Sequence, residues 1–263
     1  MQIISSKENA LIKHISKLKE KKYRSEYSEY LVEGVKLVKE AIEENANIKN
    51  VIISQEARRS GLVDKYLKDE LDKLDYIQVP DNIFKLLSDV EKPQGVLAVI
   101  QKDNCDTKID YSQDIILALD DIQDPGNLGT IIRTADSCGL TQILVSKGTV
   151  DSYNSKVIRS TMGAIFRVKI IECDELTETL KKVQENDFKI MVTSLEAKKS
   201  IYDLELNKTA IVIGNEANGV SKQVLDISDE KAIIPMLGNT ESLNASVATG
   251  VILYEYVRQK LIM

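Results

Sequence analysis

The chain has 263 residues and a formal net charge of −6, with 43% hydrophobic and 29% charged residues. This composition is typical of a globular protein with one large domain or two smaller ones. No apolar run approaches the ~20 residues of a membrane-spanning helix, and the first residues lack the pattern of a signal peptide. We therefore expect a cytoplasmic protein without membrane contact. The three cysteines and one histidine are too few and too widely spaced for a metal site.

Positive charge is concentrated at the N-terminal end of this acidic chain. The basic side chains there that could reach phosphates are Lys13, Lys17, Lys21, Lys22 and Arg24. A segment of this kind is often only the solvated face of a helix, and a negative net charge argues against a nucleic-acid partner. At this point both interpretations stay open.

The first hundred residues alternate between short strands and amphipathic helices. Ser5-x-x-Glu8 has the form of a capping box, and the apolar residues after it share one helical face. The elements expected next are a strand 29–33, a helix from Gly34 to about Asn45, a strand 50–54, a helix 62–71, a strand 76–80, a helix 83–87 capped by Asp81 and a strand 95–101. This alternation predicts a small α/β domain.

A polar segment without periodicity follows. We place a linker at residues 105–113, between an N-terminal domain of residues 1–104 and a C-terminal domain of residues 114–263. The strands expected in the second domain are 115–120, 142–146, 167–171, 189–194, 210–214 and 232–235, and its helices are 128–138, 155–161, 175–186 and 241–260. The strands are continuous apolar runs, which is typical of parallel strands buried on both faces.

Three segments of the second domain place polar residues directly after buried strands, at residues 127–135, 214–219 and 234–248. Ligands of open α/β sheets bind outside the carboxyl ends of the strands. Ordinary structure explains much of each segment, since Asn127 would be a good N-cap and Gly139 a good helix terminus. It does not explain Arg133, which lies among apolar residues close to the end of a strand.

Taken together and in this order, the three segments resemble the SpoU/TrmH family of the SPOUT methyltransferases. They read N-L-G-x-x-x-R-T-A, G-x-E-x-x-G and I-P-M followed by S-L-N-x-S-x-A. The resemblance covers roughly residues 114–260. Residues 1–101 look like the substrate-binding domain that precedes the catalytic domain in the rRNA-modifying members.

The resemblance implies an α/β fold whose C-terminal parallel sheet carries a trefoil knot, with S-adenosylmethionine bound in the knotted loops. It also implies methyl transfer to a ribose 2′-hydroxyl of RNA, in 23S rRNA, by a homodimer that forms through the catalytic domain. The implied catalytic residues are Arg133, Asn127, Glu216, Ser242 and Asn244, and the implied cofactor-binding residues are Gly214, Ile234, Met236 and Leu243. No phosphate-binding glycine loop occurs in the chain, and this cofactor needs none.

Several alternatives stay open. The residues do not decide whether Arg133 is a general base or a cation that orients the substrate and stabilises developing negative charge. A guanidinium stays protonated in proteins, which makes the first role difficult. The substrate could instead be tRNA, although the long N-terminal domain favours rRNA. The chain could also be a catalytically silent RNA-binding or ribosome-assembly factor, although the retained polar residues favour an enzyme. With RNA as the partner, we expect the N-terminal basic residues to contact it.

Overall fold

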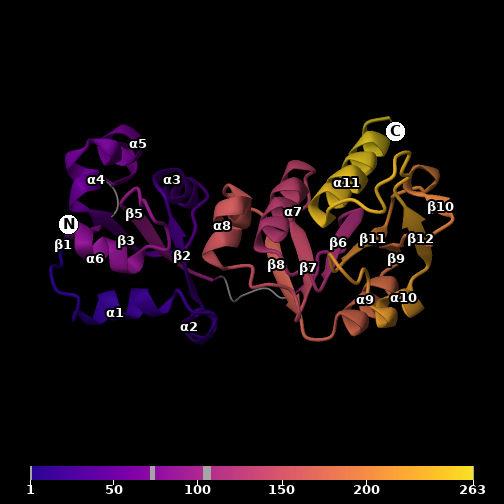
Figure 1. Cartoon of the computed structure of the whole chain (residues 1–263), viewed down its shortest axis with the longest axis horizontal. Coiled ribbons are helices and arrows are strands. Elements are labelled where there is room, and N and C mark those ends of the chain that lie inside the picture. Colours follow the sequence, from indigo (N-terminus) through magenta and orange to yellow (C-terminus); the bar gives the residue numbers. More distant parts are fainter. Residues whose placement is uncertain (1, 72–74, 103–107, 263) are drawn as a thin grey trace. The chain divides into compact units, whose positions relative to one another are not determined.

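The computed structural model describes residues 2–71, 75–102 and 108–262, and Figure 1 shows the course of the chain. Its contacts divide it into two compact units. The first consists of residues 1–106 with 153–166, and the second of residues 107–152 with 167–263. Part of the expected linker, residues 105–107, lies outside the described residues, so the domain boundaries stay a prediction.

The first unit is built on a mixed five-stranded sheet in the order β1-β4-β3-β5-β2. Its strands are β1 (Gln2–Ile3), β2 (Glu29–Glu33), β3 (Ile48–Ser54), β4 (Ile77–Val79) and β5 (Val96–Gln101). Its helices are α1 (Ala10–Lys17), α2 (Lys21–Tyr27), α3 (Val35–Glu43), α4 (Gln55–Arg59), α5 (Leu62–Leu71), α6 (Asp81–Leu87) and α8 (Ser155–Thr161), followed by a 3₁₀ turn at Ala164–Phe166. One core cluster joins the apolar faces of α1 and α6 to the sheet.

The predicted capping box is wrong. Helix α1 begins at Ala10, and the side chain of Asn9 caps it by accepting a hydrogen bond of 2.9 Å from the N–H of Leu11. The N–H of Glu8 instead donates to the hydroxyl of Ser6. Asp81 is likewise the first residue of α6 and not its N-cap, because Pro80 occupies that position.

Arg24 is a structural residue of the first unit. Its side chain is buried, and the residue is only 5% exposed. Nη1 donates to the carbonyl oxygens of Leu18 at 2.8 Å and Lys19 at 2.6 Å, which tie α2 to the end of α1. A buried guanidinium that is bonded to the backbone cannot also reach a phosphate. We therefore correct the expectation from sequence and remove Arg24 from the residues expected to contact RNA.

The second unit contains a seven-stranded, fully parallel sheet in the order β10-β12-β9-β11-β6-β7-β8. Its strands are β6 (Ile115–Asp120), β7 (Gln142–Ser146), β8 (Lys169–Cys173), β9 (Lys189–Thr193), β10 (Lys199–Ser200), β11 (Thr209–Gly214) and β12 (Glu230–Ile233). Its helices are α7 (Pro125–Ser137), α9 (Leu176–Gln184), α10 (Lys222–Ile227) and α11 (Ala245–Ile262), with a 3₁₀ turn at Ile201–Asp203. The predicted α/β class and parallel sheet are confirmed.

Helices cover both faces of this sheet, α7 and α11 on one and α9 and α10 on the other (Figure 1). Every residue of β6 and β11 is buried, as their continuous apolar sequences predict. In the described part of the chain, no helix has the length and apolar character needed to cross a membrane. The described residues also hold no group of three metal-ligating side chains.

The structural role of Arg24 can be tested by replacing it with alanine. We expect Arg24→Ala to lower the free energy of unfolding by about 2–4 kcal/mol, because two carbonyl oxygens lose a charged donor. Urea denaturation of the full chain measures this change. The exposed Lys21→Ala serves as the control and should change stability by less than about 0.5 kcal/mol. Equal stability of the two variants would contradict the structural role.

Candidate active site

The two central strands end side by side, and the loops that follow them carry the predicted polar residues. Gly214, at the end of β11, is in register with Asp120, at the end of β6. The side-chain amide of Asn215 donates to the carbonyl oxygen of Asp121 at 2.8 Å, and the N–H of Ser221 donates to the carboxylate of Asp120 at 2.8 Å. The register of these strands therefore brings together residues that are about a hundred positions apart in the chain.

The loop after β11 turns so tightly that the last residue of the strand must be glycine. The backbones of Asn215 and Gly219 exchange two hydrogen bonds of 3.0 and 2.9 Å, and Gly219 has a left-handed φ of +70°. A Cβ on Gly214 would lie 2.2 Å from the carbonyl carbon of Gly219 and 2.2 Å from the nitrogen of Val220. No side chain fits there, so any substitution would open the turn that carries Glu216.

Glu216 reaches from this turn to the N-terminal end of α7. Its carboxylate accepts hydrogen bonds from the backbone N–H groups of Gln123 and Asp124, both at 3.1 Å, and from the side-chain amide of Asn127 at 2.9 Å. Unpaired N–H groups and the helix dipole make the start of a helix favourable for an anion. The site thus holds a negative side chain at a position that stabilises its charge.

Asn127 does not cap α7, contrary to the sequence-based expectation. The cap is Asp124, whose carboxylate accepts a hydrogen bond of 2.9 Å from the N–H of Asn127, and Pro125 is the first helical residue. The buried side chain of Asn127 is consequently available to donate to Glu216 and to accept from the side-chain amide of Asn244, at 2.9 Å.

Asn244 connects the third predicted segment to the other two. Its side-chain oxygen accepts hydrogen bonds from the N–H of Ser246 at 2.9 Å and from the Ser246 hydroxyl at 2.7 Å, at the start of α11. Its amide nitrogen donates to Asn127. A continuous chain of hydrogen bonds therefore runs from Asn244 through Asn127 to Glu216, and each amide has one defined orientation.

The hydrogen bonds also determine the charge of Glu216. Partial burial raises the pKa of this carboxyl, but the hydrogen bonds from Asn127 and from the backbone N–H groups of Gln123 and Asp124 outweigh it. The pKa of Glu216 is thus lower than its ordinary value of 4.5. At neutral pH the group is an ionised acceptor and cannot serve as a proton donor.

The other predicted residues are not joined to this network. Arg133 lies on α7 with its side chain exposed, and within the described residues it makes no hydrogen bond or ion pair. Ser242 is also exposed and has no hydrogen-bond partner among the described residues. The predicted cofactor residues other than Gly214 lie between β12 and α11 and are half-buried: Ile234, Met236 and Leu243.

Sequence reasoning missed four residues that shape the site. Asp121 has a left-handed φ of +64°, and its carboxylate accepts a hydrogen bond of 2.8 Å from the side chain of Gln123. Asn215 donates to the backbone of Asp121, and Asp124 caps α7. Of these four residues, only Asp124 could have been identified from the sequence, because an aspartate directly before proline is a common start of a helix.

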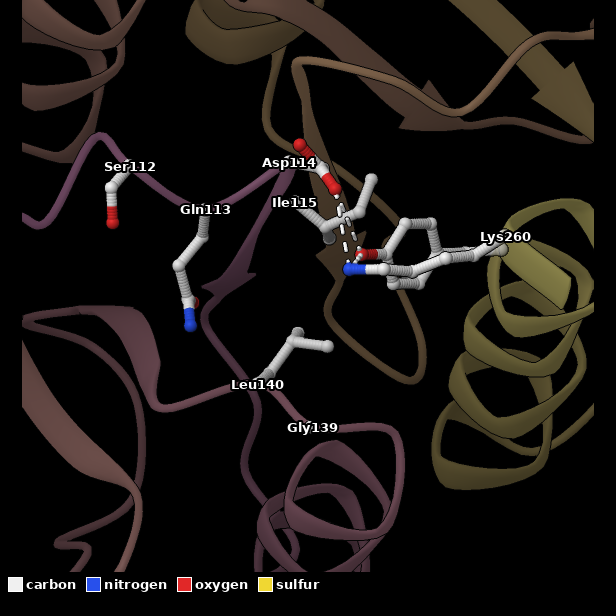
Figure 2. Close-up of a pocket in the computed structure, with 8 residues that line it drawn as sticks. Ser112, Gln113, Asp114, Ile115, Gly139, Leu140 and Lys260 are labelled. Atoms are coloured by element: carbon white, nitrogen blue, oxygen red, sulfur yellow. Dashed lines mark hydrogen bonds and ion pairs between the residues drawn. The ribbon is translucent and has the colours of Figure 1, made fainter. Parts of the chain in front are cut away.

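A separate pocket of about 110 Å³ lies at the opposite, amino end of β6 (Figure 2). Asp114, Tyr256 and Lys260 meet there, with the Asp114 carboxylate 3.5 Å from the Tyr256 hydroxyl and 3.4 Å from the Lys260 ammonium. Because the predicted residues follow the carboxyl ends of the strands, this pocket is no part of the candidate site.

Comparison with known proteins agrees with these features. Residues 114–254 match the SpoU rRNA Methylase family, and residues 9–98 match the MRM3-like substrate binding domain. The chain belongs to the SpoU rRNA methylase family. The resemblance read from the three segments is thereby confirmed.

Relatives of this family match either the whole chain or its second part. The chain is 29% identical to the 23S rRNA (guanosine(2553)-2'-O)-methyltransferase RlmP of Bacillus subtilis, over 97% of this chain and 98% of that protein. It is 39% identical to the 23S rRNA (guanosine-2'-O-)-methyltransferase RlmB of Xylella fastidiosa, over 57% of this chain and 61% of that protein.

Solved structures likewise align either with nearly the whole chain or with little more than half of it. The SpoU methyltransferase AviRb from Streptomyces viridochromogenes, in complex with the cofactor AdoMet, aligns with a TM-score of 0.86 and 27% identity, over 96% of this chain and 98% of that one. The TrmH/SpoU tRNA modifying enzyme of A. aeolicus aligns with a TM-score of 0.51 and 30% identity, over 57% of this chain and 77% of that one.

The ionised state of Glu216 makes a prediction about pH. A carboxyl whose pKa is lower in the folded than in the unfolded protein stabilises the fold above the unfolded value, and this stabilisation is lost as the pH falls through the folded value. We expect wild type to be more stable than Glu216→Gln at neutral pH, and this difference should shrink as the pH falls below 4.5.

Denaturant unfolding of both proteins from about pH 7 down to about pH 3 measures this difference. Glu205→Gln, at an exposed position without a hydrogen bond or ion pair in the described residues, serves as the control. A difference between wild type and Glu216→Gln that stays constant over the whole range would contradict the hydrogen-bonded, ionised carboxylate.

Proposed function

We propose that this protein transfers a methyl group from S-adenosylmethionine to a ribose 2′-hydroxyl of RNA, with 23S rRNA as the substrate. The observation that carries the proposal is the chain of hydrogen bonds from Asn244 through Asn127 to Glu216. It connects the three segments that define the family resemblance, at the edge of the sheet where ligands bind. Arg133 and Ser242 are exposed and take no part in this network, so their retention favours an enzyme over a silent RNA-binding protein.

The segment between β12 and α11 fits the cofactor. Met236 and Leu243 are half-buried, and in the described residues their backbone N–H groups have no hydrogen-bond partner. An N–H group without a partner in the chain can donate to an acceptor on the edge of an adenine or a ribose. We therefore assign the cofactor to Gly214, Ile234, Met236 and Leu243. When bound, it supplies a methyl group that is already activated on a sulfonium.

The chain's own residues have to align the reactants and control the charge of the 2′-hydroxyl. Arg133 is exposed and lacks a carboxylate partner in the described residues, so its guanidinium is available to a ribose-phosphate. Since a guanidinium stays protonated, we assign it the orienting and charge-stabilising role and not that of a general base. Glu216 and Asn244 fix the side chain of Asn127, and the hydroxyl of Ser242 completes the set of catalytic residues.

Ribosomal RNA is favoured over tRNA by the first unit. Its match to a substrate-binding domain and the near full-length alignment with RlmP support a large RNA substrate, whereas the tRNA-modifying neighbour aligns with little more than half of the chain. We propose that residues 1–104 bind RNA, that residues 105–113 connect the domains, and that residues 114–263 perform the chemistry with a trefoil knot in the cofactor segment. We also propose a cytoplasmic location, as expected from the sequence.

A second copy of the chain is the proposed partner of α11. Ile252 and Leu253 are buried, but a second stripe of α11 is apolar and exposed. Val247 and Tyr254, which are 51% and 54% exposed, and Leu261 recur at seven-residue spacing along this stripe. A helix that is apolar on more than one side needs a further packing partner. A homodimer through the second unit would cover it.

The dimer can be tested by placing charges on this stripe. We expect the double variant Val247→Glu, Tyr254→Glu to have the mass of a monomer in light scattering, because two carboxylates would be buried in the interface. Wild type and Lys231→Glu, a charge change on β12, should keep the mass of a dimer. A wild-type protein that is monomeric at micromolar concentration and still transfers methyl groups would exclude the proposed dimer.

The role of Arg133 can be tested by methyl transfer to 23S rRNA that lacks the modification. We expect Arg133→Ala to lower the turnover number by roughly 10²–10³-fold, the typical loss for a charge-stabilising group. Cofactor affinity by calorimetry should stay nearly unchanged. Arg133→Lys keeps the charge without the planar donor pair and should retain part of the activity. Near-wild-type turnover of Arg133→Ala would remove this residue from the mechanism.

A further inference from the structure

The helices α1 and α2 present an aromatic ring between lysine side chains. The Nζ atoms of Lys17 and Lys22 lie 5.1 and 5.6 Å from the centre of the Tyr23 ring. Lys21 is exposed at the start of the same helix as Tyr23. Tyr23 itself is half-buried. Positive charge and an aromatic ring thus occur together.

Neighbouring aromatic residues support the ring of Tyr23. It stacks on Tyr27, one helical turn later, at a centroid distance of 6.0 Å and an interplanar angle of 16°. Tyr27 packs against the core cluster of the first unit and contacts the His14 ring at 4.6 Å. His14 in turn is hydrogen-bonded to Glu29 at 2.6 Å. This support orders the ring of Tyr23 before any ligand arrives.

The two lysines over the Tyr23 ring, and Lys21 on the same helix, have no ionic partner in the described part of the chain. Within the described residues, Lys17, Lys21 and Lys22 form no ion pair. Other cations of this segment are engaged: Lys13 pairs with Glu8, and Lys19 donates to the carbonyl oxygen of Ser88 at 2.7 Å. Lys17 and Lys22 are therefore free to bind an anion beside the ring, and Lys21 is free on the same helix.

We propose that Tyr23 is a stacking platform for one unpaired nucleobase of the RNA substrate, with Lys17, Lys21 and Lys22 on the flanking phosphates. An exposed cation–π contact stabilises by only about 0.5–1 kcal/mol, whereas stacking of a base on an aromatic side chain contributes about 1–3 kcal/mol. A base can therefore displace the ammonium groups from the ring, and they then reach the phosphates. A base inside a duplex is already stacked, so this surface selects a single-stranded segment. This proposal rests on the proposed action on RNA.

The experiment uses the full chain and an RNA of about 12 nucleotides with 2-aminopurine at its centre, a length within the site sizes of single-strand binders. Stacking quenches the fluorescence of this base. We expect Tyr23→Leu to weaken binding of the single strand about 5- to 150-fold, which corresponds to the stacking energy. The same variant should lose the quenching but keep the salt dependence. Tyr23→Phe should behave like wild type, and binding of the annealed duplex should be unaffected.

Two further variants separate stacking from charge. Tyr66 on α5 also has a lysine over its ring, with Lys65 Nζ at 4.9 Å, but in the described residues no second ring stacks on it. Tyr66→Leu should therefore bind like wild type. Replacing Lys17, Lys21 and Lys22 by glutamine should flatten the salt dependence by about 0.7 units of slope for each phosphate that a lysine no longer neutralises.

The outcomes distinguish this proposal from the proposed function. If wild type methylates 23S rRNA but Tyr23→Leu keeps both affinity and quenching, the stacking platform is wrong and the enzyme function stands. Wild type that binds the strand without quenching also overturns the platform, whether or not the leucine variant folds. Wild type that neither binds RNA nor transfers methyl groups overturns both.

Discussion

The loops of the second unit depend on one interaction. The carboxylate of Glu216 is bound at the N-terminal end of α7. Three donors hold it, two from the backbone before the helix and one from Asn127. If the carboxylate were removed, the buried amide of Asn127 would lose its acceptor, and the cost of an unsatisfied buried group exceeds the net gain of an ordinary hydrogen bond. The bond from Asn244 makes the start of α11 depend on the same group. Three loops far apart in the chain are therefore ordered together.

Much of the fold could be predicted because the spacing of apolar residues shows which positions of a strand or helix are buried. The strands β2, β6 and β7 and the helices α5 and α8 lie at the predicted residues. Their apolar spacing shows which faces are buried, although it does not show which distant element covers each face. Helix α2 was missed because its sequence, Lys-Lys-Tyr-Arg-Ser-Glu-Tyr, has no apolar stripe. It is held by hydrogen bonds of the buried Arg24, which composition assigned to the surface.

For the candidate site, the sequence identified several of the residues but not the hydrogen bonds between them. Asn127, Glu216 and Asn244 could be named from their motifs, but not their connection, since periodicity carries no information on which strands are neighbours. The placement of β11 beside β6 supplies it. The backbone donors of Gln123 and Asp124 could not be found at all, because a peptide N–H is the same in every residue. Only the left-handed turn at Asp121 and the cap at Asp124 aim them at Glu216.

The acidic character of the chain and its proposed RNA substrate are compatible because electrostatic interactions in salt are local. Charges separated by more than about 8 Å are largely screened at physiological ionic strength. The net charge of −6 is therefore a poor guide to any one surface. Around Tyr23 the unpaired cations dominate, and at Glu216 the N–H groups and the dipole of α7 compensate the one charge closest to the proposed chemistry. A phosphate that approaches Tyr23 meets unpaired ammonium groups, so the excess of acidic residues elsewhere in the chain does not prevent binding of RNA there.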